Sequence, residues 1–251
     1  MCRMFFRCST ESFNLGYELL KNFIASCHWT YFKRYNVFGH HGSGWGFAYI
    51  PEGNEKLIVK RDINPIYFSD WENLTKIKTR FLLVHARKMI QPWKKTIKNV
   101  HPINIGEKYL ITHNGTINLD SFPEPLDPKL REININTEMD TRRYLCLIMD
   151  ELKRKYDLKE AIESTLRRIQ VNSAANAFLF NSRECIVIKN QKNTFNGRHT
   201  TLFLAKDDNS ILVSTTPINP QLKFFEIPNN TLIKIDLINS KSKISELVIS
   251  E

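Results

Sequence analysis

Residues 109 to 117 read Tyr109-Leu110-Ile111-Thr112-His113-Asn114-Gly115-Thr116-Ile117, an apolar run that leads directly into an Asn-Gly pair. The segment from residue 107 to residue 112 has the composition of a β-strand. Asn-Gly is typical of a two-residue hairpin turn. Alternatively, the Asn114 carboxamide and the Gly115 backbone N–H can act as two donors that converge on an oxyanion, and glycine leaves that approach open. The pair by itself allows both interpretations.

The segments around this stretch follow a definite order of helices and strands. Residues 12 to 27 place apolar side chains on one helical face, with Ser12 as the expected N-cap. Two further helices are expected to begin near Thr137 and at Asp157. Strands are expected at residues 45–50, 56–60, 80–85, 107–112, 185–189, 201–205, 210–214, 224–227, 231–237 and 244–249. This order predicts an α+β fold in which helices cover antiparallel sheets.

The composition is that of one soluble domain. The chain has 251 residues, of which 42% are hydrophobic, and no linker or change of composition divides it. We therefore expect residues 2–251 to form a single domain. No apolar stretch approaches the roughly 18 residues of a membrane helix, and no signal peptide is apparent, so we expect a cytoplasmic protein without membrane contact. Five cysteines without Cys-x-x-Cys spacing indicate neither a disulfide framework nor a zinc site.

The formal net charge of +10 raises the question of nucleic-acid binding. Lys and Arg are scattered along the chain, with small groups within residues 94–98 and 142–155, and no nucleic-acid recognition motif accompanies them. We therefore expect no nucleic-acid partner. A solvated basic surface, or attraction to an acidic partner, explains the charge.

Cys2 directly follows the initiator methionine. Removal of Met1 would place a thiol and a free α-amine on one residue. An α-amine with a pKa near 7.7 to 8.0 can accept the proton of a thiol with a pKa near 8.5, so the residue could activate itself. Alone, the position is also compatible with chance.

Two charged residues stand at the ends of predicted elements. His85 and Arg87 are spaced i, i+2 at the end of an apolar strand and should project from the same side of the sheet. Arg87 could bind a carboxylate in bidentate fashion, or could be an ordinary surface residue. Thr137 and Asp140 fit a capping box at a helix start. The carboxylate of Asp140 could equally hold an ammonium group.

The order of these motifs resembles the class II glutamine amidotransferases, whose glutaminase domain is an N-terminal-nucleophile hydrolase. The matching segments, in the family's order and approximate spacing, are residues 1–3, 44–49, 85–87, 99–102 and 113–117, followed by the acidic helix start. The resemblance covers residues 2 to about 150, and beyond that it rests on element order. It implies a four-layer αββα sandwich of two antiparallel sheets.

The resemblance also implies roles for individual residues. Cys2 matches the nucleophile, Arg87 the residue that binds the substrate α-carboxylate, and Asn114 with Gly115 the oxyanion hole. Asp140 matches the acid that receives the substrate α-ammonium group. No metal or organic cofactor is implied.

The position of the ammonium-binding acid depends on the alignment. Both Asn136-Thr137-Glu138 and Asp140-Thr141-Arg142 can be matched to the Asp-Thr-Glu that the family usually carries there. We choose Asp140, because Tyr144 and Leu147 then occupy buried helix positions.

Two departures from the family pattern bear on the substrate. Residues 88–91, Lys-Met-Ile-Gln, replace the small residues and threonine common after the arginine, and Ser43 stands where an aspartate often precedes Gly-Trp-Gly. The length of the chain, with no attached synthase domain, resembles stand-alone members that hydrolyse γ-glutamyl compounds. We therefore expect hydrolysis of glutamine or a γ-glutamyl amide. The alternatives are an ammonia-donating subunit of a synthase partner, an acylase for another amide, and a catalytically silent basic scaffold.

Overall fold

The computed structural model describes residues 2–28, 40–54, 56–89, 95–106, 108–155, 157–181, 183–192, 200–238 and 240–249. Met1 and two residues of the divergent segment, Ile90 and Gln91, lie outside these ranges.

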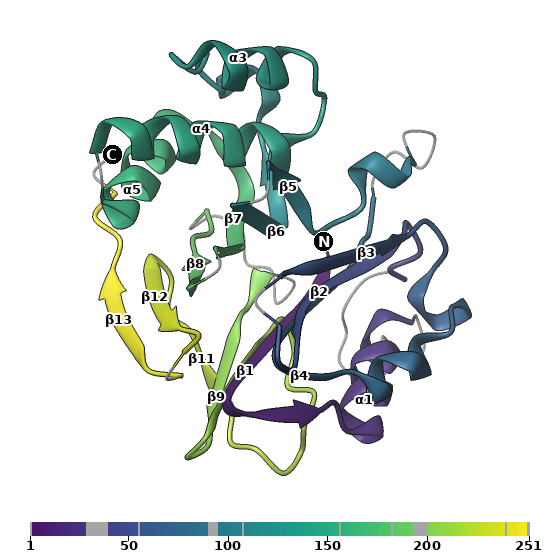
Figure 1. Ribbon diagram of the computed structural model, residues 1–251. Helices are drawn as coiled ribbons and strands as arrows, with labels where there is room; N and C mark the ends of the chain where they lie inside the picture. Colours follow the sequence, from purple (N-terminus) through teal and green to yellow (C-terminus); the bar gives the residue numbers. More distant parts are fainter. Residues whose placement is uncertain are drawn as a thin grey trace.

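Two antiparallel sheets form the centre of the molecule (Figure 1). Within the described residues, sheet A has seven strands, in the spatial order β11 (Phe225–Glu226), β9 (Phe203–Lys206), β10 (Ser210–Ser214), β1 (Arg3–Asn14), β4 (Lys78–Ala86), β2 (Trp45–Pro51) and β3 (Ile58–Asp62). Within the same residues, sheet B has six, in the order β13 (Ser242–Glu246), β12 (Thr231–Asp236), β8 (Glu184–Lys189), β7 (Val171–Phe180), β6 (Tyr109–Ile117) and β5 (Ile103–Ile105).

Helices cover the outer face of each sheet (Figure 1). Helix α1 (Tyr17–Cys27) packs on sheet A, and α4 (Asp140–Lys155) and α5 (Leu158–Arg168) pack on sheet B, with α3 (Pro128–Ile135) beside α4. Short 3₁₀ turns connect the strands: η2 (Ile66–Phe68), η3 (Trp71–Lys76), η5 (Ile97–Asn99) and η6 (Leu119–Ser121). The expected four-layer αββα sandwich is therefore confirmed.

Three apolar cores hold the four layers together, one at each interface. Alternation along β1 feeds two of them: Phe5 packs against Phe23 of α1, whereas Phe6 faces sheet B and lies 6.1 Å from Phe178 between ring centroids. Tyr144 of α4 belongs to the third core, between sheet B and the helices. All five cysteines are described, buried and free of disulfides.

The structure corrects the expected start of the first helix. Residues 3 to 14 form strand β1, at the centre of sheet A, and Ser12 lies within this strand instead of capping a helix. The helix begins at Tyr17, after Gly16. Because β1 mixes polar residues with apolar ones on both faces, its periodicity does not separate it from the helix that follows.

The start of α4 is also corrected. The helix begins at Asp140, so Thr137 does not form a capping box with that residue. Instead, the Thr137 hydroxyl accepts a hydrogen bond from the Met139 N–H at 3.2 Å, which caps the turn that precedes the helix. Asp157 is the N-cap of α5, as the sequence predicts, and accepts from the Glu160 N–H.

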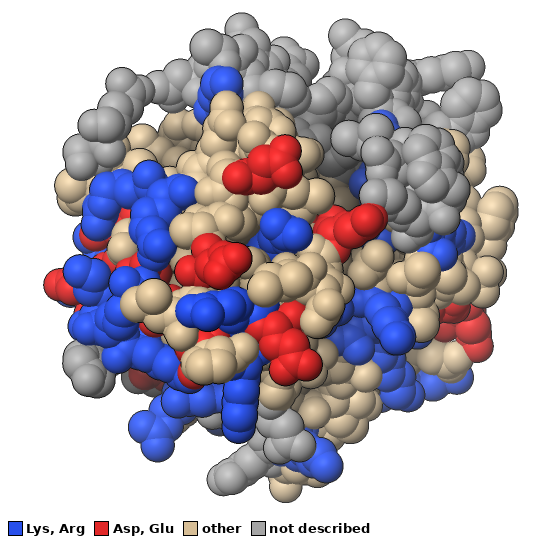
Figure 2. Space-filling model, turned by 90° about the horizontal axis from the view of Figure 1, so that it is seen from above, with Lys and Arg blue, Asp and Glu red and all other residues tan. Residues whose placement is uncertain are grey.

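The surface carries its basic residues in several groups. Figure 2, which looks down on the end of the molecule where α3 and α4 lie in Figure 1, shows Lys and Arg side chains with Asp and Glu between them. Within the described part of the chain, no helix has both the length and the apolar character needed to cross a membrane.

Candidate active site

Strand pairing places Cys2 beside Arg87. In the ladder between β1 and β4, Arg3 is opposite Ala86, so the residues just beyond this pair, Cys2 and Arg87, lie at the same end of these two strands. Cys2 is buried, and its Sγ lies 3.9 Å from the Lys88 carbonyl oxygen.

Asn114 and Gly115 lie inside a strand. Strand β6 continues to Ile117, and Asn114 and Gly115 pair with Asn176 and Ala175 of β7, with a shift in register just after Gly115. The alternative of a hairpin turn is therefore wrong. A Cβ atom at Gly115 would lie 1.7 Å from the Ala174 carbonyl oxygen, so the close approach of the two backbones requires glycine here.

The orientation of the Asn114 carboxamide follows from one hydrogen bond. The Cys2 backbone N donates to Asn114 Oδ1 at 2.8 Å. A backbone N–H can only donate, so the oxygen of the carboxamide must face Cys2. Nδ2 is therefore the atom of this carboxamide that can donate to a substrate oxygen. Because Oδ1 of the same group is bonded to Cys2, Nδ2 lies near the nucleophile candidate.

Asp140 is held by backbone amides at the start of α4. Its Oδ1 accepts from the Thr141 N–H at 2.7 Å, and its Oδ2 accepts from the Ile117 N–H at 3.1 Å. The side chain is 23% exposed. These two N–H donors fix the direction of the Asp140 carboxylate.

One pocket collects these groups. Its volume is about 540 Å³, and its lining includes Cys2, Arg87, Gly115 and Asp140. Asn114 is fully buried behind the lining and is bonded to Cys2. All five residues predicted from the sequence therefore meet at one place, although they come from both sheets and from α4.

Arg87 carries a buried donor that is not satisfied. Its Nη1 is buried and makes no hydrogen bond. Burial lowers the pKa of Arg87, whereas Cys2 and Asp140 act in the opposite direction. An unpaired donor of a buried charged group is costly, and a carboxylate with two acceptor oxygens suits it. The geometry thus fits a site for an anionic group beside Asp140.

Sequence reasoning missed a network of side chains behind Asp140. The hydroxyl of Thr141 lies 3.0 Å from His101 Nε2 and 3.1 Å from His113 Nδ1. His85 stacks on His101 with ring centroids 4.2 Å apart. The sequence pairs His101-Pro102 and Asp140-Thr141 were the available signals, but neither indicates that His101 and Thr141 are in contact.

One backbone partner determines the position of a hydrogen in this network. His113 Nε2 lies 3.1 Å from the Ala174 carbonyl, which can only accept, so Nε2 carries a hydrogen. The Thr141 hydroxyl lies within hydrogen-bond distance of both rings and also donates to Asp140 Oδ1 at 3.4 Å. These contacts hold Thr141 in place, and its backbone N–H in turn donates to the Asp140 carboxylate.

Burial keeps two of these imidazoles neutral. Burial lowers the pKa of His85 to about 3, and the adjacent Arg87 lowers it further. Burial also places the pKa of His101 well below its ordinary value, with His85 and then Arg87 acting in the same direction. Among the described residues, no group of three or more His, Cys, Asp or Glu side chains is arranged to hold a metal ion.

Ser43, one of the two departures from the family pattern, positions the segment that follows Arg87. Its N–H donates to the Arg87 carbonyl at 3.0 Å, and its hydroxyl accepts from the Met89 N–H at 3.1 Å. Lys88 and Met89 consequently line the pocket. The divergent residues therefore lie where they can contact a substrate.

The two helix-covered antiparallel sheets form the fold of the N-terminal-nucleophile hydrolases. Residues 16–221 match the family described as class-II glutamine amidotransferases, and the chain belongs to this family. No curated protein matches the chain significantly in sequence. Membership of the family supports the hydrolysis or transfer of a glutamine amide as the general class of activity.

Solved structures share the fold at low sequence identity. The glutamine phosphoribosylpyrophosphate amidotransferase of B. subtilis is 15% identical with a TM-score of 0.63, and the match covers 99% of this chain and 50% of that one. An allosteric regulatory enzyme of purine biosynthesis is 16% identical with a TM-score of 0.67, again with 99% and 50% covered. The chain thus spans half the length of these two proteins. A class-II glutamine aminotransferase domain protein of Silicibacter pomeroyi is 12% identical with a TM-score of 0.63, and the match covers 98% of this chain and 99% of that one.

Proposed function

We propose that the protein hydrolyses the side-chain amide of glutamine or of a γ-glutamyl compound, with Cys2 as an N-terminal nucleophile. The observation that carries the proposal is the pocket itself. It combines the Cys2 thiol, the Asn114 carboxamide, the half-buried Arg87 guanidinium and the oriented Asp140 carboxylate, which are the groups needed to bind an α-amino acid and attack its side chain.

In this proposal, opposite charges fix the substrate. The Arg87 guanidinium binds the α-carboxylate and satisfies its buried Nη1, and the Asp140 carboxylate binds the α-ammonium group. The γ-carbonyl then faces Cys2. Asn114 Nδ2 and the Gly115 N–H donate to the oxygen of that carbonyl as it becomes an oxyanion.

The chemistry proceeds in two steps once Met1 is removed. The α-amine of Cys2 accepts the thiol proton, sulfur attacks the γ-carbon, and the same proton is delivered to the leaving nitrogen, which departs as ammonia or an amine. Water then attacks the γ-glutamyl thioester. The products of this step are the free γ-carboxylate and the regenerated thiol.

A glutamine-analogue diazoketone tests the role of Cys2. The thiols of the other four cysteines resist ionisation, because burial raises the pKa of Cys8 to about 11, of Cys27 and Cys146 to about 12, and of Cys185 well above its ordinary value. We expect intact mass spectrometry to show loss of Met1 and one adduct on Cys2, with no adduct and no turnover in Cys2→Ala. Full activity in protein that retains Met1 would rule out the mechanism.

Within this function we favour a hydrolase of γ-glutamyl compounds over an ammonia donor. Lys88 and Met89 line the pocket in place of the small residues that are common in the family. The alternative is a glutaminase subunit that supplies ammonia to a separate synthase. It predicts that glutamine is the only substrate. Purified protein should therefore be assayed with glutamine and with γ-glutamyl peptides and amines. Faster glutamate release from a γ-glutamyl compound supports the hydrolase, and activity only with glutamine and a co-purifying partner contradicts it.

A further inference from the structure

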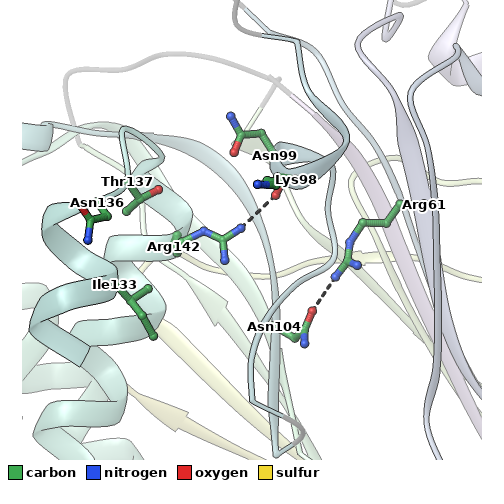
Figure 3. A pocket seen from close by; sticks show the side chains of 8 residues that line it. All are labelled: Arg61, Lys98, Asn99, Asn104, Ile133, Asn136, Thr137 and Arg142. Atoms are coloured by element: carbon green, nitrogen blue, oxygen red, sulfur yellow. Dashed lines mark hydrogen bonds between the residues drawn. The ribbon is translucent and has the colours of Figure 1, made fainter. Parts of the chain in front are cut away.

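A second pocket lies beside the catalytic one and has a different character. Its volume is about 460 Å³, and its lining includes Arg61, Lys98 and Arg142 (Figure 3). The two pockets share Asn99, and η5 and the start of α4 contribute to the walls of both. None of the residues to which we assign a catalytic or substrate-binding role lines this second pocket.

The two arginines of this pocket are held in place by neutral oxygens. Arg61, from edge strand β3, donates to the Pro102 carbonyl and to Asn104 Oδ1, both at 2.7 Å. Arg142, from α4, donates to the Lys98 carbonyl at 2.9 Å. Figure 3 shows the two guanidinium groups pointing toward one another from opposite walls. The contacts thus fix the direction of both groups without neutralising either.

This part of the molecule holds an excess of positive charge. Among the ion pairs of the described residues, none includes Arg61, Lys98 or Arg142, and the pocket lining contains no acidic residue. Burial lowers the pKa of Arg61, and Arg142 lowers it further. Two guanidinium groups that face each other repel, so an anion between them would gain from both.

We propose that this pocket binds a phosphate group, either as inorganic phosphate or as the phosphate of a small phosphomonoester. A phosphate group carries about −1.5 to −2 charges and three acceptor oxygens, which matches two guanidinium groups and one ammonium group better than the single charge of a carboxylate does. The amide side chains of Asn99 and Asn136 add neutral hydrogen-bonding groups to the lining.

The test is a binding experiment that does not depend on catalysis. Thermal unfolding and calorimetry on the full chain, in the Cys2→Ala background, compare sodium phosphate with sodium chloride at matched ionic strength. We expect phosphate to raise the Tm beyond the effect of chloride, because a ligand that binds only the folded state stabilises it. A phosphomonoester arm separates the two sources: tighter binding of the ester identifies an organic phosphate, and equal binding identifies phosphate itself.

Variants connect the effect to the pocket. Arg142→Gln and Lys98→Gln should each raise the Kd for phosphate at least tenfold. Lys98 is exposed, so this variant should fold normally even if Arg142→Gln is destabilised. The matched control is Arg131→Gln, which removes an arginine of α3 that forms an ion pair with Glu124. This variant should bind phosphate normally. An equal response of Lys98→Gln and wild type, or no response beyond chloride, overturns the proposal.

Discussion

Asn114 is fully buried, and its carboxamide contacts the backbone of the nucleophile candidate. Under the proposed mechanism, Asn114→Ala should reduce kcat by about a hundredfold to a thousandfold, the usual effect of removing one oxyanion donor. The measurement is kcat alongside the Tm.

Asn176 supplies the matched control for this prediction. It is equally buried and stands opposite Asn114 on β7, and among the described residues its carboxamide bonds to two backbone groups, the Thr200 carbonyl and the Asn190 N–H. Asn176→Ala should therefore lower the Tm while the folded enzyme keeps most of its kcat. If the two variants lose stability alike and neither loses kcat, Asn114 is a structural residue.

Arg87 and Asp140 carry the opposite charges that the substrate backbone would need. Arg87→Gln and Asp140→Asn should each reduce kcat/KM by an amount equivalent to about 2 to 5 kcal/mol, because one substrate charge is left desolvated without a partner. Steady-state kinetics with the best substrate measure the loss. Asn136→Ala is the control, since Asn136 lies in the neighbouring pocket, and a severe loss there with a silent Asp140→Asn would show that our alignment of the helix start is wrong.

The composition of the site was accessible from the sequence because its residues sit in short motifs with a fixed order. Cys2, Arg87, Asn114, Gly115 and Asp140 were all predicted, and they line or support one pocket. The residues that support them were not accessible. Thr141 and His101 are separated by 40 positions, and only the packing of α4 against sheet B brings them to 3.0 Å.

At the scale of elements, the close approach of β6 and β7 beside the register shift requires glycine at position 115. Gly115→Ala would place a methyl group 1.7 Å from the Ala174 carbonyl oxygen, so β6 and β7 would have to separate. We expect a loss of about 1 to 3 kcal/mol in the free energy of unfolding, measured by urea denaturation. Gly16→Ala is the control for the steric clash: a Cβ there meets no atom within 4 Å, and because Gly16 is the N-cap of α1 this variant should cost no more than about 1 kcal/mol.

The buried histidines His85, in strand β4, and His101, just before β5, should make the free energy of unfolding depend on pH. Because the pKa of His85 is about 3 in the folded protein and about 6.5 when unfolded, the unfolded state binds more protons between these values. Stability is therefore full above pH 6.5 and falls as the pH drops, by about 1.4 kcal/mol per pH unit for each such histidine. His101 should behave in the same way.

Urea denaturation between pH 6.5 and 5 measures this slope, in a range where carboxylates remain largely ionised. His85→Gln should flatten the dependence, whereas the change of the exposed His40 to Gln should leave it unaltered. A slope that is the same in His85→Gln and wild type would contradict the assignment of a neutral buried ring.

Elements with one clear periodicity were predicted, and those without it were not. Strands β2, β4, β8, β10 and β12 and helices α4 and α5 lie close to their expected positions. Strand β1 was missed because both of its faces are buried, one under α1 and one against sheet B, so its apolar residues do not alternate with polar ones. The three-residue strand β5 and helix α3, whose apolar face is short, are too small to give a signal.

At the scale of the whole molecule, the site depends on the contact between the two sheets. Cys2 and Arg87 adjoin strands of sheet A, Asn114 and Gly115 belong to sheet B, and the core between the sheets keeps Cys2 within hydrogen-bond distance of Asn114. Neither sheet contains a complete site. Packing between the layers is therefore expected to control activity as well as stability.

Phe178 tests this dependence. Its ring is fully buried between the sheets, 6.1 Å from Phe6, and its backbone pairs with Thr112, two residues before Asn114. Phe178→Ala should lower the free energy of unfolding by about 3 to 5 kcal/mol, the combined effect of lost burial and a cavity. Phe68→Ala, at a side chain that is 79% exposed, should change it by no more than about 0.5 kcal/mol. Because both sheets share this core, far-UV circular dichroism and loss of activity should follow one denaturation curve in the Phe178 variant. Two separated transitions would mean that the sheets unfold independently, and that the site is held together by something other than the core between them.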